Sequence, residues 1–421
     1  MSTYQSMGKT FLSLFSSFEK SELCQLYIYP SVPDVDICQS YYRVTDRDVL
    51  NGYFHFGKVA SRVLQSEDID TTHSFFETEQ DENFLRSREK KPVTLLCRDL
   101  LWRFSLWYSK KLKDWLTEQK PTCIFLAPGE SKFIYDIALR ISKELKIPIV
   151  VYLCDEFYFI KYRGSVLKRL QLFLLKRKME KTIQRCKSIV GICDELSAAY
   201  SEHFNKETCT IHNGCSSELL RVCGGKEKIG GISYFGNLSL GRFESVCDIG
   251  EALDAINRKT GEELKLSLYT PILEPEAKKR LDSVSSVELC GFVTGEQYRE
   301  AFLNSDLLLH VESFSEENAE RVRHSISTKI ADSLGSGIPL IAYGPADVAS
   351  VHYLAENDCA LVISRKQDVE NMLFRIISSE SDRKRIVENA LFVADSNHRS
   401  LENSRKLRSV LLKVSAQREM P

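Results

Sequence analysis

Four polar residues at the start of one predicted helix could bind a nucleoside diphosphate. The segment SISTKIADSLGSGIPLIAYGP, residues 325–345, predicts a short helix, a Gly-x-Gly turn and a buried strand. Either Ser327 or Thr328 can cap this helix, whose unpaired N–H groups and positive dipole end attract phosphate. Lys329 adds a positive charge, and the carboxylate of Asp332 on the same face could accept hydrogen bonds from ribose hydroxyls. The alternative is a solvated i, i+3 ion pair on a surface helix.

The pattern S-T-K-I-x-[DE]-x-L-x-S-G-x-P-[IL], which begins at Ser327, resembles the donor-binding segment of bacterial glycosyltransferases with the GT-B fold. The resemblance is strongest over residues 232–363 and is closest to the retaining nucleotide-sugar enzymes of family 4 type. It implies an α/β fold with two Rossmann-like domains facing a cleft. It also implies a hexosyltransferase activity that uses a nucleotide-diphosphate sugar as donor substrate, without a metal or other cofactor.

A second loop that could contact the donor is FGNLSLGR, residues 235–242, which lies between a predicted strand and a predicted helix. Ligands of parallel α/β sheets bind at the carboxyl ends of the strands, which is where Gly236, Asn237 and Arg242 would lie. The resemblance implies an arginine near position 237 and a lysine near 242. Asn237 lacks the first charge, but Arg242 and Lys329 could still hold two phosphates and stabilise the departing diphosphate. Alone, the loop is also compatible with an ordinary turn.

The strand DLLLHVESF places His310 and Glu312 at the same predicted edge. The resemblance implies that Glu312 contacts the transferred sugar and that Asp332 is the ribose-binding carboxylate. These two acids are farther apart in this sequence than in the family, which indicates an inserted loop, SEENAERVRHS, at residues 315–325. We expect this loop to be either a mobile lid or a charged surface loop. The resemblance also implies that closure of the two domains expels water from the site.

Length and periodicity indicate two α/β halves. A chain of 421 residues with 43% hydrophobic residues is long enough for two domains. Short apolar segments alternate with helical patterns from Thr122 onward and again after a Gly- and Lys-rich stretch, which predicts parallel sheets. We therefore assign residues 1–220 to an acceptor-binding domain and 221–398 to a donor-binding domain. Residues 399–421 form a terminal helix that the resemblance implies packs back across both domains.

Smaller patterns give further structural expectations. A helix is predicted from Ser131 to Lys146, and TGEQ at residues 294–297 has the pattern of a capping box. A third helix follows Arg242, and its core-facing residues recur at helical spacing; they are Val246, Ile249, Leu253 and Ile256. His212-Asn213-Gly214 predicts a turn with the glycine at positive φ.

The first domain should supply the acceptor side of the cleft. Asp155 and Glu156 follow the buried strand IPIVVYLC and could orient an acceptor hydroxyl or act as a base. An N-cap role for Asp155 is equally compatible with the pattern. Gly8 and Lys9 would lie in the first strand-to-helix loop, near the sugar or the acceptor.

The chain begins without the apolar strand that should open such a half. The segment MSTYQSMGKTFLSLFSSFEK passes directly from polar residues into a helical pattern. Since parallel sheets of this kind depend on a central strand, we expect either a start upstream of Met1 or a strand from another segment. The first is the preferred interpretation, and a chain without this strand would be unstable or inactive.

Charge and cysteine usage indicate the compartment and the partners. The net charge of −1 gives no general reason to expect nucleic-acid binding. The thirteen cysteines, without a C-x-x-C pair, are typical of a reduced cytoplasmic protein. The longest apolar run is too short to cross a bilayer. Ten Lys or Arg residues between Lys161 and Lys187 surround the apolar run LQLFLL. They predict a basic amphipathic helix. Its charged face either contacts the inner face of the cytoplasmic membrane, near a lipid-linked acceptor, or is an ordinary solvated surface.

Other enzyme classes fit less well. Gly8-Lys9-Thr10 imitates the end of a P-loop, but Thr3 stands where that motif needs glycine. The D-x-D triplets that begin at Asp34, Asp46 and Asp68 lie in polar segments, which argues against the metal-nucleotide site of the other large glycosyltransferase fold. A Rossmann dehydrogenase would need G-x-G-x-x-G after a strand, and this motif is absent. Two alternatives of the same fold remain open: a nucleotide-sugar 2-epimerase-like enzyme, and a catalytically silent binding protein. We favour transfer of a sugar to a glycan or lipid-linked acceptor in capsule, exopolysaccharide or lipopolysaccharide synthesis.

Overall fold

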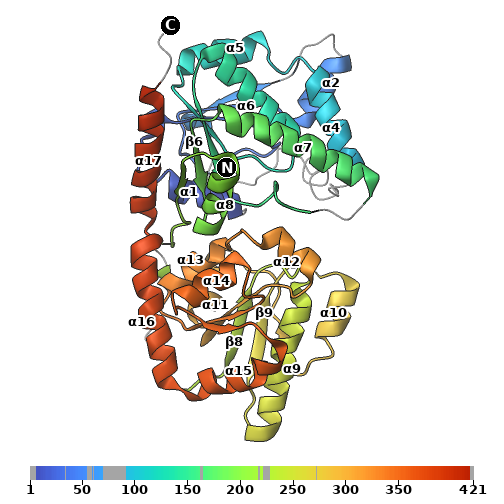
Figure 1. Cartoon of the computed structure of the whole chain (residues 1–421), viewed down its shortest axis with the longest axis vertical. Helices are drawn as coiled ribbons and strands as arrows, with labels where there is room; N and C mark the ends of the chain where they lie inside the picture. Colours follow the sequence, from blue (N-terminus) through green and yellow to red (C-terminus); the bar gives the residue numbers. More distant parts are fainter. Residues whose placement is uncertain are drawn as a thin grey trace. The chain divides into compact units, whose positions relative to one another are not determined.

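The structure is a computed structural model, and it describes residues 6–33, 35–54, 59, 61–69, 92–161, 165–216, 219–220, 228–271 and 273–417. The chain divides into two compact units (Figure 1). Unit 1 comprises Met1–Ile211 together with Leu401–Pro421, and unit 2 comprises His212–Ser400. The division thus falls at Ile211, upstream of the boundary at 220 expected from the sequence, and the end of the chain belongs to unit 1.

Unit 1 contains two sheets among its described residues. The first has the order β4-β5-β6-β7 and is wholly parallel, as the alternation after Thr122 predicts. Its strands are β4(Ile124–Leu126), β5(Ile149–Leu153), β6(Ser188–Gly191) and β7(Thr208–Thr210). The second has the order β1-β2-β3, with β1 and β2 parallel and β3 antiparallel. Its strands are β1(Cys24–Tyr27), β2(Ser40–Arg43) and β3(Arg62–Gln65).

The helices of unit 1 cover these sheets. They are α1(Ser6–Leu14), α2(Asp46–Phe54), α4(Pro92–Phe104), α5(Lys110–Gln119), α6(Lys132–Leu145), α7(Val166–Arg185), α8(Asp194–Phe204) and α17(Ser400–Ala416), whose first residue is the last of unit 2. The helix predicted from Ser131 to Lys146 is confirmed as α6, with Ser131 at its N-cap and Lys146 in the left-handed conformation at its C-cap. Gly8 and Lys9 lie inside α1, so their predicted place in a loop is wrong. Residues 1–5, including Thr3, are outside the described residues.

Helix α17 is attached to unit 1 by polar contacts. Ser17 donates its backbone N–H to Ser404 Oγ at 2.9 Å. Arg408 Nη2 donates to Glu22 Oε1 at 2.6 Å. The described contacts of α17 therefore tie the C-terminal segment to the first residues of the chain.

Unit 2 contains one parallel six-stranded sheet with the order β10-β9-β8-β11-β12-β13. Its strands agree with the alternation predicted after the Gly- and Lys-rich stretch; they are β8(Gly231–Phe235), β9(Lys265–Tyr269), β10(Val287–Leu289), β11(Leu307–Val311), β12(Leu340–Tyr343) and β13(Leu361–Ile363). From β8 the chain builds outward to β9 and β10, then returns to the other side of β8 with β11. The loops that follow β8 and β11 therefore leave neighbouring strands in opposite directions, which makes this edge the topological switch point where ligands bind.

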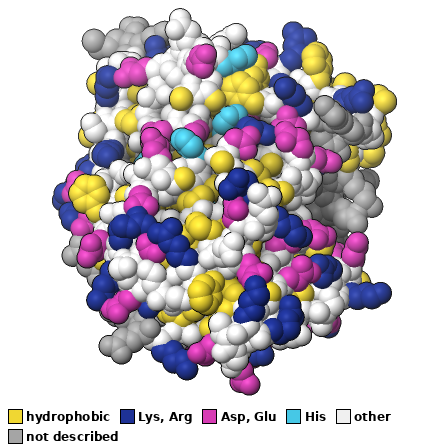
Figure 2. Space-filling model, turned by 60° about the horizontal axis from the view of Figure 1, so that its bottom comes forward, with side chains coloured by type: hydrophobic (Ala, Val, Ile, Leu, Met, Phe, Trp, Pro, Cys, Tyr) yellow, Lys and Arg dark blue, Asp and Glu magenta, His cyan; other side chains and the backbone are white. Residues whose placement is uncertain are grey.

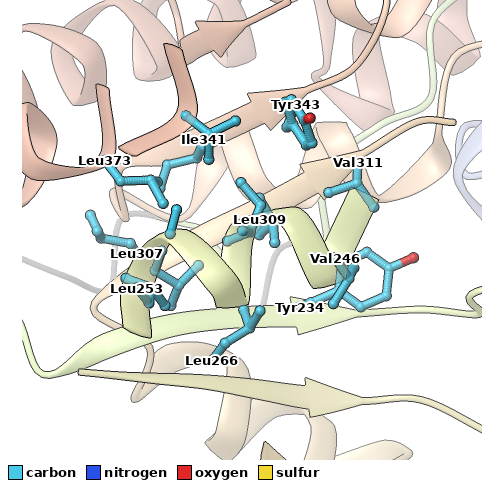
Figure 3. Close-up of a cluster of buried hydrophobic side chains, with 14 of the residues drawn as sticks. Tyr234, Val246, Leu253, Leu266, Leu307, Leu309, Val311, Ile341, Tyr343 and Leu373 are labelled. Atoms are coloured by element: carbon cyan, nitrogen blue, oxygen red, sulfur yellow. The ribbon is translucent and has the colours of Figure 1, made fainter. Parts of the chain in front are cut away.

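The core of unit 2 forms because helix α9(Arg242–Thr260) presents an apolar stripe to this sheet. The predicted residues Val246, Ile249, Leu253 and Ile256 are all buried, which confirms the stripe. Figure 3 shows Val246 and Leu253 of α9 beside strand residues such as Leu266 and Leu309. This packing fixes the start of α9, and with it Arg242, against the sheet.

The remaining helices of unit 2 are α10(Pro275–Leu281), α11(Gly295–Leu303), α12(Glu316–Val322), α13(Thr328–Gly335), α14(Ala349–Glu356), α15(Val369–Ser378) and α16(Glu380–Asn397). The predicted capping box at residues 294–297 is wrong, since the Thr294 side chain makes no capping hydrogen bond. The segment expected as a loop at 315–325 instead contains the helix α12, and its role as a lid stays a prediction. Its Ala319 is buried against Val348 and Val351, and Arg323 is paired with Asp347.

Charges on the surface are mixed. On the face drawn in Figure 2, Lys and Arg side chains are interspersed with Asp and Glu. Such interspersion agrees with the net charge of −1. On this face, any attraction to a polyanion would depend on a local cluster.

A buried histidine network ties the start of unit 2 to its end. His398 Nδ1 lies 2.7 Å from the carbonyl oxygen of Asn213, and its Nε2 lies 2.9 Å from Tyr353 Oη. Cys215 donates its backbone N–H to the His398 carbonyl at 2.8 Å. The predicted turn with Gly214 at positive φ is wrong, since Gly214 is not among the residues with that conformation. Burial is the main cause that lowers the pKa of His398 to about 3, so its ring is neutral at pH 7.

We expect His398 to make the protein sensitive to acid. Its pKa in the folded state lies below the unfolded value of about 6.5, so its contribution to stability is complete above that pH and is lost as the pH falls towards 3. The loss should be about 1.4 kcal/mol for each pH unit. Urea unfolding of His398→Gln between pH 7 and pH 5 should show a shallower pH dependence than the unchanged protein. The exposed His352→Gln is the control, and an unaltered slope in His398→Gln would contradict the expectation.

Candidate functional site

The candidate site lies at the switch point of the unit 2 sheet. The loop 236–241 follows β8, and Glu312 follows β11, which pairs directly with β8. The start of α13 carries Lys329 towards the same place, since a Cβ atom added to Gly236 would lie 2.9 Å from Lys329 Nζ. Three segments that are far apart in the sequence therefore supply side chains to one edge of the sheet.

An ion pair between Arg242 and Glu312 is the centre of the site. Arg242 Nε donates to Glu312 Oε2 at 3.0 Å, and Nη2 donates to Oε1 at 3.1 Å. The Glu312 side chain is 4% exposed and that of Arg242 is 17% exposed, so water screens the pair only weakly. Burial raises the pKa of Glu312, and the Arg242 guanidinium opposes that rise. The bidentate geometry fixes both side chains in orientation as well as position.

The backbone around Glu312 is also held. Ser245, one turn into α9, donates its hydroxyl to the Glu312 carbonyl at 2.8 Å. The Glu312 N–H donates to the carbonyl of Tyr343 in β12 at 2.9 Å. Sequence reasoning missed Ser245, although its position three residues after Arg242 on one helix face could have indicated it.

His310 lies beside the ion pair in an uncharged form. Its Nε2 is 3.5 Å from Glu312 Oε1 and 3.0 Å from Ser350 Oγ. Burial, followed by the charges of Arg242 and Lys329, lowers the pKa of His310 to about 3. The ring therefore offers hydrogen bonds, and it adds no charge near neutral pH. Ser350 is a second contact residue that sequence reasoning missed.

The loop after β8 depends on glycine. Gly236 has φ of +150° and Gly241 has φ of +72°, and a Cβ atom added to Gly241 would lie 2.7 Å from Ser313 Oγ. The loop is closed by Tyr234 Oη, which donates to the Asn237 carbonyl at 2.7 Å. Asn237 Oδ1 accepts hydrogen bonds from the N–H and the hydroxyl of Ser239. The Asn237 amide oxygen thus stabilises its own loop.

The start of α13 agrees with the sequence in position but not in its capping bond. Ser327 occupies the N-cap and Thr328 is the first residue of the helix, while the Ser327 hydroxyl makes no capping hydrogen bond. Lys329 is exposed. Asp332 Oδ1 accepts the backbone N–H of Ser216 at 2.8 Å, so one described role of this carboxylate is to hold the loop before residue 217. Its predicted contact with a ribose stays a prediction.

The residues predicted for the acceptor side lie in unit 1. Asp155 is exposed and follows β5, while Glu156 is 2% exposed. Glu156 Oε1 accepts the backbone N–H groups of Tyr158 and Phe159, the latter at 2.7 Å. The alternative N-cap role of Asp155 is wrong, because Ser165 caps the next helix, α7.

The described residues contain no group of three or more His, Cys, Asp or Glu side chains that could hold a metal ion. Of the D-x-D acids, Asp34 and Asp70 are outside the described residues. Asp46 is buried and accepts hydrogen bonds from Arg98 Nε at 2.9 Å and from Trp102 Nε1 at 2.7 Å. It therefore serves the packing of unit 1.

Taken together, the unit 2 site places a guanidinium, an ammonium group, a neutral imidazole and one buried carboxylate around a glycine loop. The two cations suit a ligand with two negative charges, and the carboxylate and imidazole suit hydroxyl groups. Of the predicted donor-side residues, the structure brings together Arg242, Glu312, His310 and Lys329 around Gly236.

Comparisons with known proteins find a shared fold. No protein-family model matches the chain, and no curated protein matches its sequence. An alpha,alpha-trehalose-phosphate synthase (UDP-forming) from Burkholderia vietnamiensis is similar in structure, with a TM-score of 0.60, 11% identity, and coverage of 98% of this chain and 97% of that one. A sucrose-phosphate synthase from Thermosynechococcus elongatus has a TM-score of 0.56, 11% identity, and coverage of 78% and 80%. HepE from Anabaena in complex with UDP-glucose has a TM-score of 0.54, 13% identity, and coverage of 93% and 99%.

These likenesses confirm the predicted α/β class with two Rossmann-like domains and the GT-B fold. Among the described residues, the helices are all too short or too polar to span a bilayer.

Removal of Arg242 should destabilise unit 2, because Glu312 would be left buried without its partner. We expect Arg242→Ala to lower the free energy of unfolding at neutral pH by about 3–5 kcal/mol. The loss should shrink as the pH falls, since Glu312 then takes up a proton. Urea unfolding at several pH values would measure both effects.

The exposed pair between Arg280 and Glu251 provides the control. Arg280→Ala removes a partner that is 39% exposed, so the change should be about 1 kcal/mol or less. If Arg242→Ala cost no more than Arg280→Ala, the central ion pair would have no special structural role.

Proposed function

We propose that this chain is a glycosyltransferase that moves a hexose from a nucleotide-diphosphate sugar to a glycan or lipid-linked acceptor in cell-surface polysaccharide synthesis. The observation that carries the proposal is the convergence of Arg242, Glu312 and Lys329 at the switch point of the unit 2 sheet. Support also comes from HepE, a protein of similar fold that was crystallised with UDP-glucose. The proposed family is that of the retaining enzymes of family 4 type.

In this proposal, Arg242 and Lys329 bind the diphosphate. A guanidinium has five N–H donors, and Glu312 receives two of them in the structure, so the same side chain can bridge Glu312 and a phosphate. The N–H groups of the first turn of α13, beginning at Thr328, add a third source of positive potential. These fixed dipoles and charges would stabilise the negative charge on the departing diphosphate, and the reaction would not need a metal ion.

Glu312 and His310 would position the sugar. Glu312 is held by Arg242, so its lone pairs can accept sugar hydroxyls without movement of the carboxylate. Neutral His310 can exchange hydrogen bonds with the same sugar. Asp332 would accept ribose hydroxyls with the lone pairs that Ser216 does not use.

The acceptor would bind in unit 1, at the carboxyl end of β5. There Asp155 is exposed and would take the proton from the attacking hydroxyl, while buried Glu156 holds the loop that follows. Gly8 and Lys9 of α1 are the other proposed acceptor-side residues. The proposed location is the cytoplasm, at the inner face of the cytoplasmic membrane.

One observation favours a second function, that of a catalytically silent binding protein. Asn237 provides no positive charge where the resemblance implies an arginine, and its amide oxygen is used by Ser239. Such a protein would bind a nucleotide without releasing it from a nucleotide sugar.

A thermal-shift screen tests the donor site. UDP, GDP, TDP, ADP and CMP would each be added to the full chain, to Lys329→Ala, and to the surface variant Lys278→Ala as control. We expect one nucleotide to raise the melting temperature, since saturation at 100 times Kd adds about 2.7 kcal/mol to stability. The shift should be lost in Lys329→Ala and kept in Lys278→Ala. No shift with any nucleotide, from a folded sample, would overturn the proposal.

A second experiment separates the enzyme from the silent protein. Release of nucleotide from sugars of the base found in the screen would be measured for the unchanged chain and for Asp155→Asn. A general base contributes about 10²–10⁴-fold, so transfer to an added acceptor should fall by that factor while the thermal shift persists. Asp114→Asn, on the exposed face of α5, is the control. Binding without any release of nucleotide would favour the silent protein.

A further inference from the structure

Helix α12 brings a polar side chain to the glycine loop of the candidate site. The helix lies between Glu312 and Asp332, in the segment that the sequence indicated as an insertion. Its third residue, Asn318, is half-buried. A Cβ atom added to Gly241 would lie 2.8 Å from the Asn318 nitrogen Nδ2. The Asn318 amide therefore lies against the glycine that precedes Arg242.

Ser313 brings a second hydrogen-bond donor to the same point. It is 5% exposed, and its Oγ atom would lie 2.7 Å from the Cβ atom added to Gly241. This Oγ accepts the backbone N–H of Ser315 at 3.2 Å, which leaves the hydroxyl proton for another acceptor. Among the residues that the structure describes, neither this proton nor the Asn318 amide is donated to an acceptor. Two donors thus converge on the bare backbone of Gly241.

Helix α12 holds Asn318 in place. The next residue, Ala319, is 3% exposed and packs against Val348. Arg323, at the end of the helix, is paired with Asp347. Both anchors lie in the loop that follows β12, so the helix is fixed to the same sheet as the candidate site. A ligand would find the Asn318 amide already ordered, which lowers the entropic cost of binding.

The groups around Gly241 favour an anion. Arg242 keeps N–H groups beyond the two that Glu312 receives. Gly241 is the N-cap of α9 and has no side chain to satisfy the first N–H groups of that helix, which carry positive potential. A guanidinium, an amide NH2, a hydroxyl and a helix start are all donors. Phosphate oxygens, which accept several hydrogen bonds at once, match this set.

Two glutamates in the first turn of α12 could repel an anion, but each has a basic partner. Glu316 accepts a hydrogen bond from Arg323 at 3.0 Å, and Glu317 accepts one from Arg321 at 3.2 Å. Their side chains are 86% and 75% exposed, so water and salt screen their charge. Their effect at Gly241 is therefore small.

We propose that Asn318 binds the diphosphate of the donor, with its side-chain NH2 on the phosphate that carries the sugar. That phosphate is the one expected next to Ser313, because Glu312 would position the sugar. The inference rests on the proposed function and adds to it a contact from α12. It also gives a donor to the loop whose Asn237 provides no positive charge.

The same contact would act during transfer. The acceptor oxygen forms a bond to the anomeric carbon, and its proton passes to Asp155. The bond between that carbon and the phosphate oxygen breaks, and its electron pair stays on the oxygen. A donor that is already in place stabilises the charge that grows there.

The sugar is the competing ligand, because an amide can also exchange hydrogen bonds with hydroxyl groups. Asn318→Asp distinguishes the two, since it has nearly the same shape but replaces the NH2 donor by a charged acceptor. A carboxylate at this position would repel a phosphate, whereas it would still accept hydrogen bonds from a sugar.

Titration calorimetry with inorganic pyrophosphate tests the inference without an assumption about base or sugar. The full chain, Asn318→Ala and Asn318→Asp would be compared. Asn318→Ala should raise the Kd about tenfold, as expected for one hydrogen bond to a charged group. Asn318→Asp should raise it further, because like charges then face each other.

A second titration keeps the test specific. It uses the nucleoside diphosphate that gives the largest thermal shift and the monophosphate of the same base. Asn318→Ala should weaken the diphosphate about tenfold and leave the monophosphate unchanged, since only the diphosphate has the second phosphate. Unchanged binding of the monophosphate would also show that the rest of the site is intact in the variant.

The matched control is Asn371→Asp, which makes the same chemical change at an exposed position of α15. Glu317→Gln is the control within α12 itself. Both should bind pyrophosphate like the unchanged chain, and their melting temperatures and those of the Asn318 variants would be measured alongside.

Four results would overturn the inference: no binding of pyrophosphate by the unchanged chain, equal binding by Asn318→Ala, an equal loss in Asn371→Asp, or an equal loss of the monophosphate. Unchanged pyrophosphate binding with weaker binding of a nucleotide sugar in Asn318→Ala alone would assign Asn318 to the sugar. The proposed function can fail separately: pyrophosphate binding that depends on Asn318, without a thermal shift for any nucleotide, would support the phosphate contact and overturn the glycosyltransferase.

Discussion

The buried ion pair between Arg242 and Glu312 is the constraint on which the unit 2 site depends. It joins the first residue of α9 to the first residue after β11, and those elements are adjacent only because β11 returns to the side of β8 that β9 leaves open. Burying two charges is costly, so the pair persists only with good geometry and with the surrounding polar groups satisfied. Ser245, the Tyr343 carbonyl and the core stripe of α9 supply that support. The core of unit 2 therefore sets the position of its charges.

Burial and the ion pair together determine the protonation states at the site. Burial, followed by the charges of Arg242 and Lys329, keeps the His310 ring neutral, and the Arg242 guanidinium opposes the rise that burial causes in the pKa of Glu312. The Arg242 side chain is thus held in place before any ligand arrives, so binding would not have to order it. Lys329 differs, because it is exposed. Its Nζ atom can lie next to position 236 only because Gly236 has no side chain. The site combines one rigid cation with one that can adjust its position.

The regular parts of the fold could be predicted from the sequence because they are determined by periodicity within a short window. Strands such as LLLHV and the α9 stripe carry that signal in their own residues. Some of what the sequence missed depends on distant partners. The segment 315–325 looked like a charged loop, yet it is a helix, because Ala319 packs on Val348 and Val351 and Arg323 binds Asp347. For the same reason Asp332 could be placed on a helix face, but its bond to Ser216 could not be foreseen.

Helix α7 shows most clearly where sequence reasoning stops. Its run LQLFLL contains apolar residues on every side of the helix, so the sequence could not distinguish a core stripe beneath solvated charges from a face that binds a membrane. The fold divides these residues, because Leu172 and Leu175 are buried in unit 1 while Leu170 and Phe173 are exposed. The basic residues of α7 are likewise divided by the fold: Lys178 is bound to Asp136, whereas Arg169 and Arg177 are exposed, Arg177 next to the Phe173 ring. The chain thus keeps an amphipathic surface that its own core does not require. Such exposure has a cost in solubility, and a partner that buries it would remove that cost.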